Sequence, residues 1–325
     1  EIVCPGVLLL GEVVMAPEKV VPYFGTVEKP ECHLLYNVTT MASTWHTVAT
    51  KDVSLLRRQL DIISELPRDY VFQNYLRCHD DIGWGLDYEY LENFGIQEVP
   101  HKKYLNDFLT GKYPDSFARG ELYNDDPRLG DARLCGTTAS LCGIERFGFE
   151  GNQEGVDRAV RYDITLHAFM LSQSGIPVIY SGDEIGQVND YSYKDDPEKS
   201  DDSRYLHRGK FDWKLAENRH DPATVQGKLF PVLDKLEHIR SSHGIFNSNV
   251  PIHTIDTWDN SILAFVREND EEKFIGIYNF SENDKVAWIN EEDGMYTDLI
   301  SGREMEAKGV QIPAFGCYWL CRNKQ

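Results

Sequence analysis

Acidic residues follow three of the short apolar segments in the sequence. They are Glu12 after residues 7–10, Asp80 and Asp81 after residues 71–76, and Asp183 and Glu184 after residues 176–180. If these segments are parallel strands of a barrel, their carboxyl ends form one rim and the acids line one pocket. Converging carboxylates suit glycoside hydrolysis, in which one acid protonates the leaving oxygen and another attacks or stabilises the sugar cation. The alternative is that such acids cap the following helices or lie in solvated loops.

Other kinds of site receive less support from the sequence. His79, Asp80 and Asp81 are consecutive, so on a strand they would point alternately to opposite faces, and no second cluster at metal-ligand spacing accompanies them. There is no GxGxxG, P-loop or GxSxG motif, which removes the usual signals of nucleotide binding and of a serine triad. We therefore expect no bound metal and no cofactor.

The elements that would position the acids alternate between strand and helix. Four buried strands are expected at residues 7–10, 32–36, 71–76 and 176–180, and apolar residues recur at helical spacing over about 40–64, 155–174 and 222–242. This alternation is typical of βα units with parallel strands. We expect an α/β fold over about residues 1–248.

The pattern changes near residue 249. Alternating apolar and polar residues predict five strands, over 262–267, 273–280, 285–289, 296–300 and 316–321, with polar turn segments between them. We expect residues 249–325 to form a small antiparallel β-sandwich domain that packs on the helices before it and contributes no catalytic acid.

Length and charge restrict the class of protein. The 325 residues can form one large domain with a small one. With 33 Lys+Arg against 53 Asp+Glu, the net charge of −20 repels phosphate backbones and anionic lipid. No apolar run approaches the roughly 20 residues that span a bilayer. We therefore expect neither a nucleic-acid partner nor a membrane.

The cysteines and the first residues bear on the setting of the chain. The seven cysteines are scattered and never in CxxC spacing, which favours reduced thiols and a cytoplasmic location. Residues 1–5 include neither an initiator methionine nor the basic segment of a signal peptide, which favours a truncated chain.

One run of residues is distinctive. Residues 74–84, Asn-Tyr-Leu-Arg-Cys-His-Asp-Asp-Ile-Gly-Trp, resemble the strand-seven signature of amylosucrases and sucrose hydrolases in the alpha-amylase superfamily of retaining glycosidases. Residues 10–12, Leu-Gly-Glu, are similar to the end of strand five, residues 175–184 to strand eight, and residues 199–208 to the segment beyond it. The resemblance covers essentially the whole chain and implies a TIM (β/α)8 barrel followed by a β domain.

The resemblance also implies roles for three residues at the reacting sugar. Glu12 matches the general acid/base, which is protonated when it meets the substrate and ionised when water attacks the glucosyl intermediate. Asp80 matches the carboxylate that stabilises the transition state and holds sugar hydroxyls. His79 matches a histidine that hydrogen-bonds the same glucosyl unit.

Three more residues match groups around the sugar. Arg204 matches an arginine that closes the glucose pocket through an ion pair with an acid from early in the chain. Asp81 and Arg133 match residues that contact the leaving or accepting sugar. Because Arg133 lies in a loop, an ordinary surface arginine is the alternative there.

The nucleophilic aspartate of the superfamily has no match in this chain. It lies at the end of strand four, upstream of the acid/base, and only eleven residues precede Glu12. A whole barrel takes about 250 residues. We therefore expect residues 1–248, with an insertion at about 81–134, to be strands five to eight only, the second half of a barrel.

The expected activity is that of an alpha-glucosyl-acting retaining glycoside hydrolase or transglucosylase, with sucrose as the donor and water or a glucan as the acceptor. One alternative is an alpha-glucosidase or amylase-like enzyme that acts on maltodextrins. Another is a carbohydrate-binding fragment without catalysis. Without its nucleophile this chain alone is expected to be inactive, and the free edges of its first and last strands would favour a homodimer.

Overall fold

The computed structural model describes residues 3–26, 28–126, 128, 131–289 and 294–324. Its central sheet has four parallel strands in the order β1 (Leu10–Gly11), β2 (Leu34–Tyr36), β3 (Val71–Asn74) and β6 (Ile176–Pro177). The four segments predicted as parallel strands therefore lie side by side, and their carboxyl ends meet at one edge of the sheet.

The two outer strands are shorter than predicted. Residues 7–9 precede β1 outside any strand, and Leu8 is 60% exposed, so the prediction of a buried strand over 7–10 was wrong. At the other side β6 ends at Pro177, and Val178 is exposed. Within the described residues β1 pairs only with β2 and β6 only with β3. Each outer strand therefore has a free edge, and the apolar side chains beside it remain uncovered.

The single helix predicted over 40–64 is two helices, α2 (Val38–Thr50) and α3 (Ser54–Ser64). The break comes at Lys51, whose left-handed backbone (φ 61°) ends α2. Asp52 then accepts a hydrogen bond from the Ser54 N–H at 2.8 Å, which satisfies one of the free donors at the start of α3. Hydrophobic periodicity runs through this turn without marking it, so the sequence did not reveal the break.

The two other predicted helices are α8 (Gln153–Ser172) and α10 (Val225–Ser242). Each begins at a side-chain cap. Asn152 accepts a hydrogen bond from the Gly155 N–H at 2.9 Å, and Thr224 accepts one from the Gly227 N–H at 3.0 Å. The cap at Asn152 starts α8 two residues earlier than the apolar pattern indicated.

The residues between β3 and α8 lie beside the carboxyl ends of the central strands. They form α4 (Tyr88–Glu92), α5 (Glu98–Leu109), β4 (Glu121–Tyr123), β5 (Arg133–Cys135), α6 (Thr138–Cys142) and α7 (Ile144–Phe149). β4 and β5 are an antiparallel pair, and a bridge between Ile82 and Leu134 joins this pair to the segment that follows β3.

Short helices fill the remaining connections. Near the N-terminus and after β6 they are α1 (Pro17–Val20), the 3₁₀-helices η1 (Val21–Phe24), η2 (Asp183–Ile185), η3 (Tyr191–Asp195) and η4 (Ser203–His207), then α9 (Trp213–Ala216), η5 (Glu217–His220) and η6 (Gly244–Phe246).

The C-terminal part is rich in antiparallel strands. One sheet has the order β12 (Glu304–Glu306), β11 (Met295–Asp298), β14 (Cys317–Asn323), β9 (Glu272–Asn279), β8 (Ile262–Glu268) and β7 (His253–Ile255), and a second pairs β10 (Lys285–Ala287) with β13 (Val310–Ile312). All five strands predicted here are present. The sequence missed β7, β12 and β13, each only three residues long.

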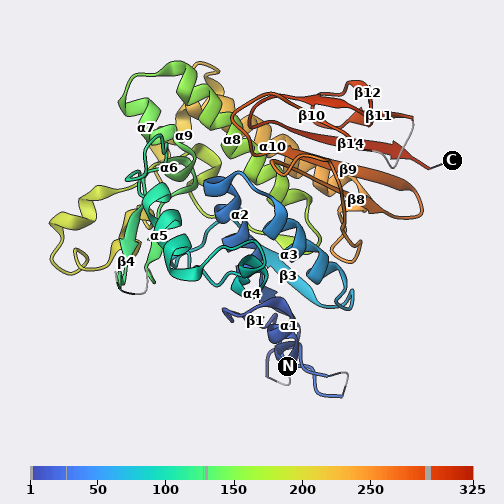
Figure 1. The fold of residues 1–325 in the computed structure, drawn as a ribbon, viewed down its shortest axis with the longest axis horizontal. Coiled ribbons are helices and arrows are strands. Elements are labelled where there is room, and N and C mark those ends of the chain that lie inside the picture. The colour runs from blue at the N-terminus through green and yellow to red at the C-terminus, as the bar shows by residue number, and fades with distance from the viewer. Residues whose placement is uncertain (1–2, 27, 127, 129–130, 290–293, 325) are drawn as a thin grey trace.

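The main hydrophobic core runs through both parts of the chain. It joins buried side chains of α2 and α8, such as Trp45 and Phe169, to those of β8 and β14, such as Phe265 and Trp319. Figure 1 shows the orange and red strands beside α8 and α10. The β-rich part therefore packs on these helices, and a second cluster lies within the β-rich part itself.

The Lys51 ammonium joins this packing. It lies 4.7–5.6 Å from the centres of four aromatic rings, those of Phe108, Phe117, Tyr162 and Phe315. Tyr162 of α8 stacks on Phe315 at 4.1 Å. The lysine therefore contributes a cation–π contact where α8 meets the β-rich part.

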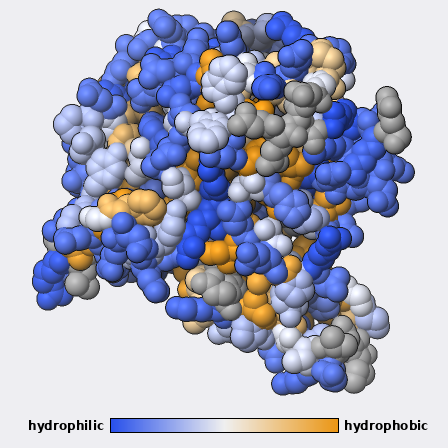
Figure 2. Space-filling view, turned by 45° about the vertical axis from the view of Figure 1, so that its right-hand side comes forward, coloured by the Kyte–Doolittle hydropathy of each residue, from blue (hydrophilic) through white to orange (hydrophobic). Residues whose placement is uncertain are grey.

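The surface is mostly hydrophilic. Figure 2 shows hydrophilic side chains over most of the face it presents, with smaller hydrophobic areas between them. Among the described helices, none combines the length and the apolar character that crossing a bilayer requires.

Candidate active site

A cavity of about 270 Å³ lies at the carboxyl ends of β1 and β3. Its charged lining residues are Glu12, Asp80, Asp81, Lys102, Asp131 and Arg133, and its aromatic and apolar lining includes Met41, Tyr75 and Trp84. Four residues singled out from the sequence, Glu12, Asp80, Asp81 and Arg133, therefore meet at one place. Lys102 and Asp131 line the cavity as well, and neither was among the predicted site residues.

Glu12 and His79 come together although β2 lies between their strands. Glu12 directly follows β1 and is exposed. A carboxylate oxygen of Glu12, the Cys78 sulfur and a ring nitrogen of His79 all lie within 4.8 Å of one another. The parallel alignment of the central strands causes this, because residues that end neighbouring strands lie on the same rim.

Asp80 is held by an arginine from η4. Arg204 Nη1 donates to Asp80 Oδ1 at 3.0 Å. Arg204 is itself fixed by two hydrogen bonds to Asp202, at 2.8 and 2.9 Å, and its guanidinium lies 4.6 Å from the ring centre of Tyr123. Arg204 thus pairs with Asp80 and Asp202, and the expected ion pair with an acid from early in the chain stays a prediction.

Asp80 and Asp81 have opposite electrostatic environments. Burial raises the pKa of Asp81, the adjacent Asp80 carboxylate raises it further, and the result is about 6. Burial also acts on Asp80, but hydrogen bonds from Arg204 and from Asp81 outweigh it and bring the pKa of Asp80 down to about 2. Between these values the pair holds one proton, on Asp81, and Asp80 stays ionised.

Cations surround the acids. Arg133 Nε lies 3.6 Å from Asp81 Oδ2, and 55% of the Arg133 side chain is exposed. Lys102 Nζ pairs with Glu98 at 2.7 Å and lies 3.6 Å from Asp131. The cavity therefore has an acidic side near Glu12 and Asp80 and a side where positive and negative groups alternate.

Asp183 and Glu184, which the sequence placed with the other acids, do not line this cavity, and that prediction was wrong. Asp183 is 1% exposed and accepts hydrogen bonds from Arg77 at 2.8 and 3.0 Å and from the Thr138 hydroxyl at 2.9 Å. Glu184 accepts a hydrogen bond from the Gly182 N–H and lines a different cavity. The buried Arg77 guanidinium needs a carboxylate, and Asp183 supplies it.

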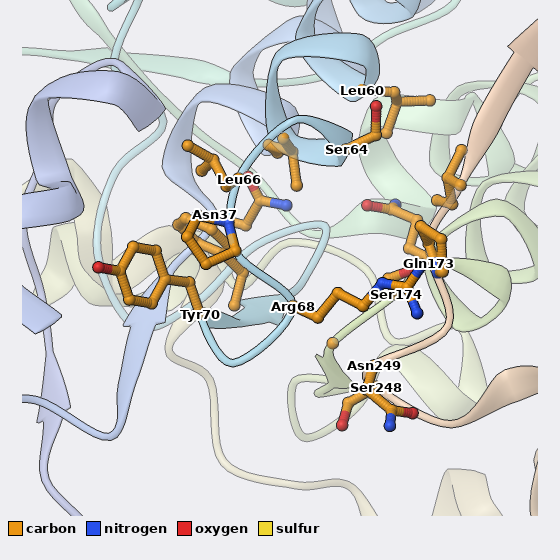
Figure 3. Close-up of a pocket in the computed structure, with 16 residues that line it drawn as sticks. Asn37, Leu60, Ser64, Leu66, Arg68, Tyr70, Gln173, Ser174, Ser248 and Asn249 are labelled. Carbon is orange, nitrogen blue, oxygen red and sulfur yellow. The ribbon is translucent and has the colours of Figure 1, made fainter. Parts of the chain in front are cut away.

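Another cavity, drawn in Figure 3, is not a substitute for this site. The loop between α3 and β3, the turn before β6 and residues 248–252 enclose it. Its volume is about 50 Å³, and none of its 16 lining residues is acidic. It is therefore about a fifth of the volume of the cavity at the ends of β1 and β3, and it offers no carboxylate for acid–base chemistry.

The arrangement at the larger cavity can perform acid–base work on a polyol. Glu12 supplies an exposed carboxyl group, Asp80 an ionised carboxylate that accepts hydrogen bonds, and His79 a ring that can donate or accept. Tyr75 and Trp84 add apolar area against which a sugar ring could pack. The group of Glu12, Cys78 and His79 could also hold a metal ion.

Comparison of the sequence with known proteins finds a relative that matches along nearly the whole chain. The chain is 25% identical over 320 residues to the glucosylglycerate phosphorylase of Escherichia coli (strain K12), which covers 98% of this chain and 53% of the phosphorylase. No protein-family model matches. The chain thus spans about half the length of this relative.

Comparison of the fold finds enzymes that act on carbohydrates. The crystal structure of AmyP in complex with maltose matches with a TM-score of 0.61 and 14% identity, over 97% of this chain and 55% of AmyP. The sucrose 6F-phosphate phosphorylase from Thermoanaerobacter thermosaccharolyticum matches with a TM-score of 0.60 and 16% identity, over 93% of this chain and 51% of that protein. The chain therefore has an α/β fold similar to that of alpha-amylase-type barrels with a β-rich domain.

Proposed function

We propose that this chain is part of an alpha-amylase-superfamily enzyme that cleaves alpha-glucosyl bonds with retention of configuration, and that Glu12 is its general acid/base. The observation that carries the proposal is that Glu12, from the end of β1, meets His79 and Asp80, from the segment after β3: Glu12 and Asp80 line the cavity, and a ring nitrogen of His79 lies within 4.8 Å of a Glu12 carboxylate oxygen. Retaining enzymes need a carboxyl group that first donates and then removes a proton. Glu12 is exposed on the cavity and can do both.

Asp80 and His79 would bind the glucosyl unit. The pair with Arg204 keeps Asp80 ionised, so this carboxylate can accept hydrogen bonds from two sugar hydroxyls. Asp81 and Arg133 lie on the far side of Asp80 and would contact the leaving or accepting group. Because Asp81 holds a proton below about pH 6, it donates a hydrogen bond in mild acid and only accepts above that pH.

The nucleophile is proposed to lie outside this chain. Asp80 is committed to Arg204 and to the Asp81 N–H, which bind its Oδ1 at 3.0 Å each, so it is poorly placed to attack an anomeric carbon. In this account the four parallel strands correspond to strands five to eight of a barrel, and residues 1–325 alone do not turn over substrate. The activity, substrates and partners proposed here are therefore those of the whole protein.

Sucrose is the proposed donor, and phosphate is a second candidate acceptor beside water or a glucan. Two cations, Lys102 and Arg133, line the cavity beside the acids and could hold an anionic acceptor. The relative that matches nearly the whole chain is named a phosphorylase. Short maltodextrins are the competing donors, since AmyP was solved with maltose.

Product analysis tests these choices. The whole protein is incubated with sucrose or with maltotriose, each with and without inorganic phosphate, and fructose, glucose and glucose 1-phosphate are quantified. Fructose release supports sucrose as the donor, and phosphate-dependent glucose 1-phosphate supports phosphorolysis. Release of the beta-anomer as the first product, or no turnover of any alpha-glucoside, would contradict the proposed reaction.

A second copy of the chain is the proposed occupant of the free strand edges. Leu8 beside β1 and Val178 beside β6 are exposed apolar residues at the two outer strands of the sheet. Sedimentation of the 325-residue chain should show a dimer that Val178→Lys weakens. A monomer at all concentrations would contradict this assignment.

The seven cysteines, none in a disulfide among the described residues, support a reducing, cytoplasmic setting for the protein.

A further inference from the structure

Three potential metal ligands from distant parts of the chain meet beside the β-rich part, away from the candidate active site. His243 directly follows α10, Glu272 begins β9, and Cys321 lies in β14. One ligand atom of each residue, a ring nitrogen, a carboxylate oxygen and the sulfur, lies within 4.8 Å of the other two. None of the three has a role in the function proposed above.

Strand pairing fixes two of the ligands. β9 and β14 are antiparallel, with Glu272 opposite Asn323 and Phe274 opposite Cys321. Glu272 and Cys321 are therefore diagonal neighbours on one face of the sheet, a spacing at which side chains reach one another. The Cys321 sulfur lies 3.8 Å from Glu272 Oε1, and His243 Nδ1 lies 2.5 Å from the same oxygen.

The burial of Glu272 is unusual for an acid. Glu272 is 8% exposed and Cys321 5% exposed, and 29% of the His243 side chain reaches solvent. A buried carboxylate is costly unless partners compensate for lost water. Its partners here are the His243 ring, the Cys321 thiol and the Ile245 N–H at 3.2 Å. Imidazole, carboxylate and thiolate are also the groups that Zn²⁺ takes as ligands.

We propose that His243, Glu272 and Cys321 bind one Zn²⁺ ion, with a water molecule as the fourth ligand. Zinc distances of about 2.3 Å to sulfur and about 2.0–2.1 Å to nitrogen or oxygen imply tetrahedral ligand atoms roughly 3.3–3.6 Å apart. The separation between the Cys321 sulfur and Glu272 is already close to this. His243 and Glu272 must move apart by about 1 Å as the metal takes the place of the proton between them.

The protons balance in a simple way. The Cys321 thiol releases its proton to solvent as the sulfur becomes a thiolate. The proton between His243 Nδ1 and Glu272 leaves that position too, and the ring that binds the metal through Nδ1 carries its proton on Nε2. Metal binding therefore releases protons, and zinc affinity should rise with pH.

The surroundings favour a cation. The C-terminal end of α10, an 18-residue helix, comes directly before His243, and its free carbonyls carry partial negative charge. The chain as a whole carries a net charge of −20. A bound ion would connect the end of α10 to β9 and β14, so added Zn²⁺ should raise the thermal midpoint of the chain in a concentration-dependent way.

Cobalt titration tests the site, because Co²⁺ substitutes for Zn²⁺ and a thiolate ligand gives a charge-transfer band. The 325-residue chain should bind Co²⁺ with this band, and Zn²⁺ should displace it. Cys321→Ser should abolish the band. His243→Gln and Glu272→Gln should each weaken the affinity for Co²⁺ by more than roughly 100-fold. Removing a residue that only hydrogen-bonds a ligand typically costs 10- to 100-fold in metal affinity, and removing a ligand itself should cost more.

Cys78→Ser is the matched control. Cys78 belongs to the other group of potential ligands, with Glu12 and His79, so this variant should keep the band. A wild-type chain without a thiolate band overturns the proposal, as does a band that Cys78→Ser keeps and that survives Cys321→Ser added to Cys78→Ser. If Cys321→Ser does not fold by circular dichroism, the affinity of Glu272→Gln for Co²⁺ decides, and an unchanged affinity overturns the site.

Discussion

Replacing Arg77 with methionine tests the buried ion pair that joins the ends of β3 and β6. Arg77 and Asp183 are 3% and 1% exposed. Three contacts at 2.8–3.0 Å connect the guanidinium to the carboxylate, and Arg77 Nη1 also donates to the His207 carbonyl at 3.0 Å. Arg77→Met leaves the Asp183 carboxylate buried with only the Thr138 hydroxyl as a hydrogen-bond donor. Removing one partner of such a pair typically costs about 3–5 kcal/mol.

A double-mutant cycle separates the pair from ordinary packing. Asp183→Leu alone leaves a buried guanidinium and should cost a similar amount, about 3–5 kcal/mol. The double variant has no uncompensated charge and should lose only about 1–3 kcal/mol, from the unpaired Thr138 and His207 groups. The coupling energy between the two sites should therefore be about 3 kcal/mol or more.

Urea unfolding followed by far-ultraviolet circular dichroism measures these values. Arg128→Met is the matched control, because Arg128 pairs with Asp126 in a similar bidentate way at the surface, and it should leave stability unchanged. A loss below about 1 kcal/mol for Arg77→Met, or a double variant as unstable as the sum of the two single variants, would refute the reasoning.

Three further perturbations should have measurable outcomes. Asp81 should titrate near pH 6 by carboxyl NMR, and its pKa should move toward the ordinary value in Asp80→Asn. Because folding raises the pKa of Asp81, its contribution to stability falls as pH rises from about 4 to 6. A titration midpoint near pH 4 in the wild type would contradict this. Lys51→Ala should lower the unfolding free energy by about 2 kcal/mol, because the ammonium among four aromatic rings is lost, and an unchanged urea midpoint would argue against that contact. Arg204→Lys should weaken the sugar affinity measured by calorimetry about tenfold. Lysine cannot form the two parallel hydrogen bonds to Asp202 that hold Arg204 against Asp80. Arg128→Lys, the control, should leave the affinity unchanged.

The sequence predicted the part of the fold that local pattern controls. The central strands were found because apolar segments such as 32–36 and 71–76 end in polar residues and alternate with helical periodicity. Once parallel strands are assumed, Glu12 and Asp80 must share one rim. Asp81 follows Asp80 and shares that rim, whereas Arg133 reaches the cavity from β5, which a bridge between Leu134 and Ile82 joins to the segment after β3.

Tertiary contacts explain what the sequence did not reveal. An acid at a strand end looks the same whether it faces a cavity, as Asp80 does, or neutralises a buried arginine, as Asp183 does. Residues 7–10 look like a buried strand, yet their exposure depends on what lies beside β1. The turn at Lys51 depends on aromatic rings from other parts of the chain, which no local window includes.

The role of Glu12 is tested most directly by Glu12→Gln in the whole protein, with the rate of leaving-group release in the first turnover as the measurement. Maltotriose, whose leaving sugar needs a proton, is compared with alpha-glucosyl fluoride, whose leaving group does not, and the exposed Glu31 gives the control variant Glu31→Gln. We predict a loss of roughly 10²–10⁴-fold on maltotriose and a much smaller loss on the fluoride. An equal loss on both substrates, or no loss on maltotriose, would contradict the assignment of Glu12 as the general acid.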